Sequence, residues 1–145
     1  MKTLKSILLG IAVMAVATVA NAKGIKGELP FSSDYVLKTY IAATTQGNLA
    51  GFDKVVTNNA TFNIAQGARA LKMDKDKMIQ SLKATEGIVQ DCTVTSTMVS
   101  QTLENTVYEV DTKFSDYTNV NMVTLVGNDQ DGWKISNVQT TMKNN

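Results

Sequence analysis

TLENTVYEVDTKF, residues Thr102–Phe114, alternates in character at every second residue, and this pattern decides the fold of the second half of the chain. Successive side chains of an extended backbone point to opposite faces. Tyr108 and Val110 therefore share one face, and Glu109 and Asp111 share the other. Such alternation predicts a β-strand that buries its apolar side and exposes its acids.

Three other stretches alternate with the same period: Ile88–Val99, Val120–Val126 and Trp133–Met142. The breaks between the four stretches are short and rich in residues that favour turns. Long alternating strands joined by short turns are typical of an antiparallel meander. The segment Asn128–Gly132 contains acids, but the first and last ligands that a calcium loop requires are missing from the sequence around it. We therefore interpret this segment as a hairpin turn.

Helical spacing marks the first half of the chain instead. SSDYVLKTYIAATTQG, residues 32–47, begins with capping side chains and ends in glycine, which predicts one helix. Asn48 is expected to cap a shorter helix, LAGFDKVV, and Asp74 a third helix over Lys75–Thr85. Two short strands are predicted between these helices, the first of them at a sheet edge: ATFNIA (residues 60–65) and ARALKM (residues 68–73).

The N-terminus has the features of a secretory signal peptide. Lys2 and Lys5 precede the apolar run Ile7–Ala20, and small residues follow, so cleavage is predicted after Ala22. The run is shorter than the ~20 residues that span a bilayer as a helix, so no stable membrane insertion is expected after cleavage. We predict an exported protein, periplasmic or extracellular, in three parts: residues 1–22 as signal peptide, 23–31 as an extended lead-in and 32–145 as one domain.

Charge and cysteine content exclude several classes of protein. The chain after Ala22 keeps all 13 acids but only 12 of the 14 basic residues, and it has no basic cluster. This argues against nucleic-acid binding, which needs a basic surplus. Cys92 is the only cysteine, so no disulfide forms within the chain. Its phase with Val94 and Met98 predicts a buried thiol, with an interchain disulfide and a reactive thiol as alternatives.

The predicted order of helix, helix, two short strands, helix and four long strands resembles the nuclear-transport-factor-2-like (SnoaL-like, cystatin-like) superfamily. The likeness rests on YVLKTYIAATTQGNLAGFDKVV, ATFNI, GARALKMDKDKMIQSLKA and DGWKISNVQTTM, and covers essentially all of the chain after the signal peptide. It implies an α+β cone whose N-terminal helices pack on a curved antiparallel sheet of about four long strands plus short strands. It also implies a pocket for a small apolar or amphipathic molecule and frequent dimerisation through the sheet. Such folds serve enzymes and non-catalytic domains alike.

The ionisable residues offer little catalytic chemistry. The chain contains no histidine, which excludes a serine–histidine triad, a histidine–aspartate dyad and the ordinary histidine-bearing metal sites. We predict neither a metal nor a cofactor. The best remaining combination is Asp53 as a base with Tyr40 or Tyr35 as a donor, for an isomerase- or dehydratase-like reaction. A helix-surface position for Asp53 is the simpler interpretation.

One set of apolar side chains is expected to point into the cone, either as packed core or as the lining of a ligand pocket: Tyr40, Phe52, Phe62, Met98, Tyr108, Val110, Met122 and Trp133. We therefore predict an exported, non-catalytic domain that binds a small apolar ligand or acts as an accessory domain. The alternatives are the Asp/Tyr enzyme and a protein–protein module. That module forms a homodimer through the polar face of the sheet: Thr93, Thr95, Thr97, Val123 and Leu125.

Overall fold

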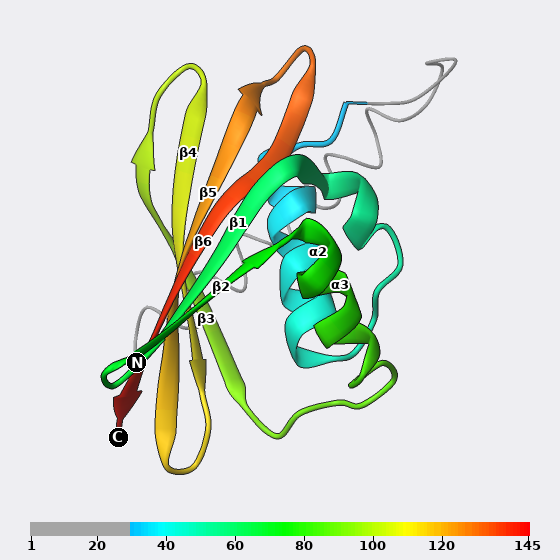
Figure 1. The fold of residues 1–145 in the computed structure, drawn as a ribbon. Helices are drawn as coiled ribbons and strands as arrows, with labels where there is room; N and C mark the ends of the chain where they lie inside the picture. The colour runs from blue at the N-terminus through cyan, green and yellow to red at the C-terminus, as the bar shows by residue number, and fades with distance from the viewer. Residues whose placement is uncertain (1–29) are drawn as a thin grey trace.

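The computed structural model describes residues 30–145, and its strands form one sheet with two α-helices on one face (Figure 1). The predicted signal peptide and nearly all of the lead-in lie outside the described residues. The elements follow in this order: α2 (Ser33–Thr45), the 3₁₀ turn η1 (Phe52–Val55), β1 (Val56–Gln66), β2 (Arg69–Asp74), α3 (Lys75–Lys83), β3 (Thr93–Gln101), β4 (Asn105–Lys113), β5 (Tyr117–Asn128) and β6 (Gly132–Asn144). Within residues 30–145, no helix has the length and hydropathy needed to cross a membrane.

The predicted caps start both α-helices. Ser32 Oγ accepts a hydrogen bond from Tyr35 N at 3.0 Å, and Asp74 Oδ1 caps α3 in the same way at 2.9 Å. These bonds satisfy amides that the first turn of a helix leaves unpaired. After α2, Gly47 has a φ of +64°, and a Cβ there would lie 2.5 Å from Gly87 N. Glycine is therefore required where the segment after α3 closes against the end of α2.

The second predicted helix is reduced to the turn η1. Val55 and Val56 are β-branched residues, which favour strands, and Val56 begins β1. β1 is therefore longer than predicted, and the edge position predicted for it is wrong. It lies between β2 and β6, where Ala60 and Phe62 are buried. Its partner β6 is at the other end of the chain, so the local pattern contains no trace of this pairing.

The four long strands form the predicted antiparallel meander, and the full sheet has the order β2-β1-β6-β5-β4-β3. β2 pairs antiparallel with β1, whereas β1 pairs parallel with β6, so the six-stranded sheet is mixed. Figure 1 shows this sheet twisting past α2 and α3, which lie together on one side of it. The predicted α+β class, with helices packed on a curved sheet, is confirmed.

The sheet face toward the helices carries the core. In β4, Tyr108 and Val110 are buried, and Glu109 between them is half-buried on the opposite face. In β5, Val123 and Leu125 are both 0% exposed. The prediction that these two residues belong to a polar dimerisation face is therefore wrong. Register explains the error, since Val123 pairs with Tyr108 and a shift of one residue exchanges the two faces of a strand.

Cys92 lies just before β3 and is only partly buried, so the prediction of a buried thiol is wrong. Burial, and then the charge of Asp91, raise the pKa of its thiol. Met98 was expected on the same buried side, but it is 42% exposed. β3 is an edge strand, and its side chains therefore have neighbouring strand residues on one side only.

Candidate functional site

Six of the eight predicted pocket residues lie in one packed core on the helix side of the sheet: Tyr40, Phe52, Phe62, Tyr108, Val110 and Trp133. Met98 is exposed, and Met122 is half-buried on the other face of β5. Two of the six, Phe52 and Trp133, also line clefts at the surface. These clefts, and one buried acid, are the candidate sites of the described part of the chain.

The predicted pairing of Asp53 with a tyrosine is not formed. The Asp53 side chain is 74% exposed, and its Oδ1 lies 3.3 Å from Lys75 Nζ in an ion pair. Tyr40 is buried in the core, where burial raises the pKa of its hydroxyl far above its ordinary value. Tyr35 stacks on Phe31 with ring centroids 5.1 Å apart. Asp53 is therefore a surface residue, and the catalytic role considered for it is contradicted.

The start of α2 contains a buried acid that the sequence interpretation missed. Asp34 is only 3% exposed, and its Oδ2 has no hydrogen-bond partner among the described residues. Burial raises the pKa of this carboxyl, and the nearby charge of Lys38 partly opposes the shift. Tyr108 is 6% exposed, and its hydroxyl donates to Ser33 Oγ at 3.3 Å. Buried Asp34 and Tyr108 therefore form a polar cluster with the partly buried Ser33 where α2 meets β4.

The tyrosine of this cluster is electrostatically coupled to the acid. The pKa of the Tyr108 hydroxyl is raised chiefly by burial. The hydrogen bond to Ser33 opposes the rise, and the charge of Asp34 adds to it. A desolvated carboxyl beside a phenolic hydroxyl has the elements of a proton-transfer pair.

Helical spacing could have revealed the buried position of Asp34. This residue is three positions before Leu37, which is fully buried, so both lie on the face of α2 that packs on the sheet. Asp34 is also in the first turn of α2, where an acid is favoured by the helix dipole. The helix dipole is by itself enough to explain an acid at this position, so Asp34 did not stand out as a buried residue.

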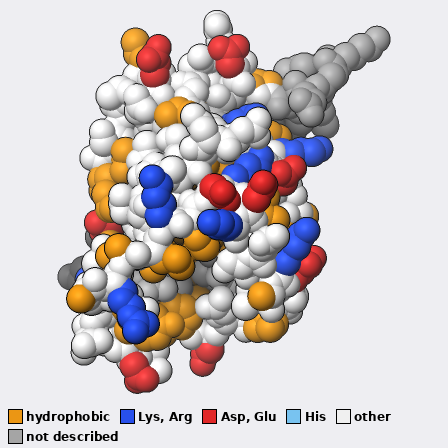
Figure 2. Space-filling view, viewed as in Figure 1, with side chains coloured by type: hydrophobic (Ala, Val, Ile, Leu, Met, Phe, Trp, Pro, Cys, Tyr) orange, Lys and Arg blue, Asp and Glu red, His pale blue; other side chains and the backbone are white. Residues whose placement is uncertain are grey.

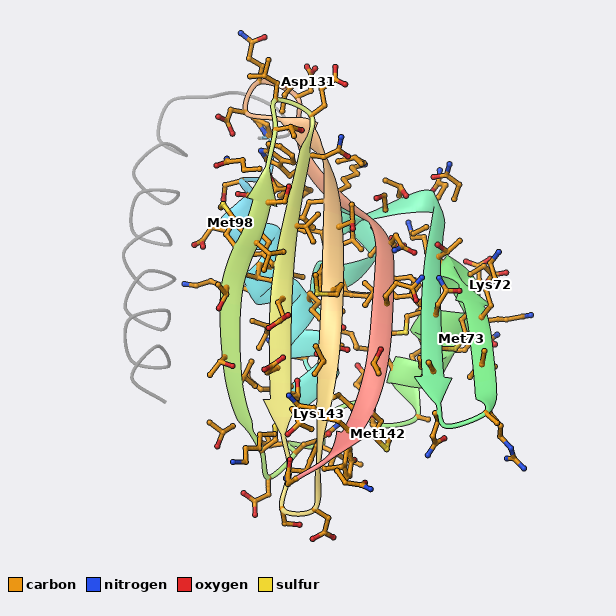
Figure 3. All side chains as sticks on the ribbon, turned by 90° about the vertical axis from the view of Figure 1, so that its left-hand side faces the viewer. Lys72, Met73, Met98, Asp131, Met142 and Lys143 are labelled. Carbon is orange, nitrogen blue, oxygen red and sulfur yellow. The ribbon has the colours of Figure 1, made fainter. Side chains whose placement is uncertain are left out.

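A cleft of about 320 Å³ lies at the end of the β5–β6 hairpin, and its walls include both aromatic and charged side chains: Pro30, Phe31, Lys54, Gln130, Asp131, Gly132, Trp133 and Lys134. We call it the Trp133 cleft. Figure 3 places Asp131 at the tip of this hairpin. The backbone of Trp133 donates to Phe31 O at 2.8 Å, which ties the segment before α2 to the first residues of β6.

Hydrogen bonds within the turn fix the shape of the Trp133 cleft. Asn128 Oδ1 accepts from the amides of Gln130 and Asp131 at 2.9 and 2.7 Å. The indole Nε1 of Trp133 donates to Asp129 Oδ1 at 3.0 Å, so its one polar atom is satisfied. Asn128 therefore holds the hairpin turn and Asp129 holds the tryptophan in place, as the turn interpretation of this segment predicts.

A second cleft, of about 270 Å³, separates η1 from α3 and is lined by Leu49, Phe52, Asp53, Ile79, Leu82 and Lys83. Figure 2 shows basic and acidic side chains mixed on the visible side of the molecule, without a broad field of one sign. Within residues 30–145, no three His, Cys, Asp or Glu side chains come together in a way that could hold a metal ion.

Solved structures with the same architecture come from several bacteria. One is a nuclear-transport-factor-2-like protein of unknown function from Silicibacter pomeroyi, with a TM-score of 0.63 and 15% identity over 74% of this chain and 90% of its own. Another, from Shewanella baltica, has a TM-score of 0.57 and 9% identity over 74% and 88%. A third, from Pseudomonas aeruginosa, has a TM-score of 0.56 and 9% identity over 74% and 94%.

The chain therefore has the nuclear-transport-factor-2-like fold, as the resemblance in its sequence implied. No family model matches the sequence, and no curated protein matches it either. The structural neighbours are themselves proteins of unknown function, and at these identities the likeness defines the fold alone. Any function must be argued from the sites of this chain.

Proposed function

We propose that this chain is an exported, non-catalytic domain that binds a small amphipathic ligand with an anionic group in the Trp133 cleft. One observation carries the proposal: Phe31 and Trp133 lie in the same cleft as Lys54 and Lys134. Ligand sites typically have volumes of ~300–1,000 Å³, with aromatic walls and a few polar groups that fix orientation. The cleft, at about 320 Å³, suits a ligand at the small end of that range.

The anionic group is inferred from the charges of the cleft. Lys54 comes from η1 and Lys134 from β6, and both side chains are exposed. Among the described residues, neither lysine belongs to an ion pair. Asp131, the acid of the same cleft, already accepts a hydrogen bond from Asn128 Nδ2 at 3.0 Å. The two lysines are therefore available for a carboxylate, sulfonate or phosphate group of a ligand.

Export is the second part of the proposal, and it rests on the basic residues, apolar run and small residues before Ala22. The chain that meets the ligand then begins at Lys23. N-terminal sequencing of the secreted or periplasmic protein tests this part independently of any ligand. A mature protein that still begins at Met1 would contradict it.

Fluorescence tests the ligand site directly, because Trp133 is the only tryptophan of the chain. We expect the amphipathic anion 1-anilinonaphthalene-8-sulfonate to bind residues 23–145 saturably and to change the tryptophan emission. The Lys54→Ala/Lys134→Ala variant should bind about tenfold more weakly, which corresponds to about 1.4 kcal/mol. Lys113→Ala/Lys143→Ala is the matched control, since it removes the same charge from exposed positions outside the cleft. Equal weakening in both variants would contradict the site.

A second function, proton transfer by an isomerase- or dehydratase-like enzyme, is favoured by the buried pair of Asp34 and Tyr108. In this proposal Asp34 takes the role of base that Asp53 cannot fill, and Tyr108 donates a hydrogen bond. The test is exchange of the α-protons of cyclic ketones into D2O, followed by proton NMR. Catalysis by the wild type that is lost in Asp34→Asn would support it. A wild type that catalyses no exchange would remove it, and dye binding in the Trp133 cleft would be unaffected.

A further inference from the structure

The two edges of the sheet differ in their charge. β2, at one edge, has three charged residues among its six: Arg69, Lys72 and Asp74. β3, at the other edge, has the sequence TVTSTMVSQ, with nine residues and no charge, proline or glycine. Natural proteins commonly place charges or proline on edge strands, because an open edge invites another strand to pair with it. β2 has this protection, and β3 lacks it.

The open side of β3 is also flanked by exposed apolar side chains. Met98 is 42% and Val99 48% exposed, and Leu103, in the turn that follows β3, is 90% exposed. Figure 3 shows β3 as the outermost strand of the meander, on the side where Met98 is labelled. The only irregularity in its pairing with β4 falls between Met98 and Ser100, so the segment Thr93–Met98 is regular. In the described part of the chain, no strand pairs with the outer side of this segment.

We propose that β3 pairs antiparallel with β3 of a second copy of this chain, so that the sheet continues across a two-fold axis. An axis at Ser96 brings Thr95 opposite Thr97, and Val94 opposite Met98 of the other copy. Threonine pairs and apolar pairs across strands are both favourable. A second copy is the occupant that this edge fits, because the central residues Val94–Met98 then meet threonine with threonine and apolar with apolar side chains, and the uncharged strand brings no like charges together.

This interface differs from the dimer face expected from the sequence. That face included Val123 and Leu125, which the structure places in the core. The three threonines of the expected set, Thr93, Thr95 and Thr97, do lie on β3, and they take part here through the edge of the strand rather than through the face of the sheet. The inference is independent of the ligand proposed for the Trp133 cleft.

Light scattering after size exclusion, over a series of concentrations of residues 23–145 with a reducing agent present, tests the interface. We expect the mass to rise toward that of a dimer. Thr95→Lys/Thr97→Lys should weaken the dimer at least tenfold, because lysines then face lysines across the axis. The matched control is Gln139→Lys/Thr141→Lys, which adds the same charge at two exposed positions of the interior strand β6. Circular dichroism establishes that each variant is folded.

Several outcomes would overturn the inference. A monomer at every concentration means that the edge remains open. A dimer weakened equally by the control variant is held through the sheet face, and a dimer that appears only without reducing agent is a Cys92 disulfide. Hydrogen exchange of the purified chain locates the interface. Slower exchange in β3 as the concentration rises would show that a second copy, and not a partner of another kind, covers this edge. A dimer without such slowing forms elsewhere.

Discussion

The start of α2 and the turn η1 each carry an aspartate, and the two carboxylates lie in opposite surroundings. Asp34 is 3% exposed and has an oxygen without a hydrogen-bond partner in the described structure. Asp53 is 74% exposed and forms an ion pair with Lys75. The lysine is the more buried partner, with 15% exposure, and its Nζ also donates to Val56 O at 3.1 Å. At η1 the ion pair and the hydrogen bond of Lys75 satisfy both charged groups, whereas at the start of α2 one carboxylate oxygen has no hydrogen-bond partner among the described residues.

This difference separates stability from function in the first half of the chain. A buried polar group without a partner costs free energy, so it persists where something other than stability retains it. Asp34 is therefore the candidate for the proton-transfer function, and Asp53 is not. The three predictions below test this contrast, beginning with the residue on which η1 depends most.

Phe52→Ala should give the largest effect. Phe52 is 2% exposed and anchors η1 in the core, so its truncation should lower the free energy of unfolding by about 3–5 kcal/mol. Urea denaturation followed by circular dichroism measures this change. Leu103→Ala is the control, because Leu103 is 90% exposed and its loss should change stability by less than about 0.5 kcal/mol. A small effect of Phe52→Ala would mean that η1 is held by its ion pair instead.

Asp34→Asn should stabilise the protein by about 1 kcal/mol at pH 7, because it replaces a buried carboxylate, whose Oδ2 has no hydrogen-bond partner in the described structure, by a neutral group of the same shape. Burial raises the pKa of Asp34, against the opposing charge of Lys38, and Tyr108 is the other titratable group that interacts with it. The folded protein therefore keeps the Asp34 proton to a higher pH than the unfolded chain does. Urea denaturation of both proteins across a range of pH measures the difference.

The sign of the pH dependence follows from the raised pKa. The contribution of Asp34 to stability is complete below its ordinary pKa of 3.8 and is lost as the pH rises through the raised value in the folded state. The gain from Asp34→Asn should therefore be smallest in acid and largest near neutral pH. If the variant is less stable than the wild type at pH 7, the carboxylate has a stabilising partner, and the contrast with Asp53 disappears.

Local patterns in the sequence predicted the parts of the fold that depend on neighbours in the chain. The alternation around Tyr108 gave its strand and its buried face, and the caps at Ser32 and Asp74 gave the starts of two helices. The turn of Asn128 and Asp131 was recognised for the same reason, since its hydrogen bonds join residues only two or three positions apart.

The remaining features depend on contacts between distant segments. The parallel pairing of β1 with β6, such as Phe62 with Val138, leaves no local trace, so β1 was expected at an edge. Met98 has the right phase for burial, but the order of the strands places it at an open edge. The Trp133 cleft needs Phe31 and Lys54 beside the hairpin, and no spacing in the sequence brings these segments together.

Asp53→Ala should have the smallest effect, at most about 0.5 kcal/mol, because an exposed ion pair contributes little and is screened by salt. Lys75 keeps its hydrogen bond to Val56 O when Asp53 is removed, so the link between α3 and β1 should survive. Thermal unfolding at low and high salt measures the change, and the small loss should vanish at high salt. A loss of several kcal/mol that persists in salt would show that Asp53 is part of the packing at η1. The two aspartates would then differ in exposure but not in importance.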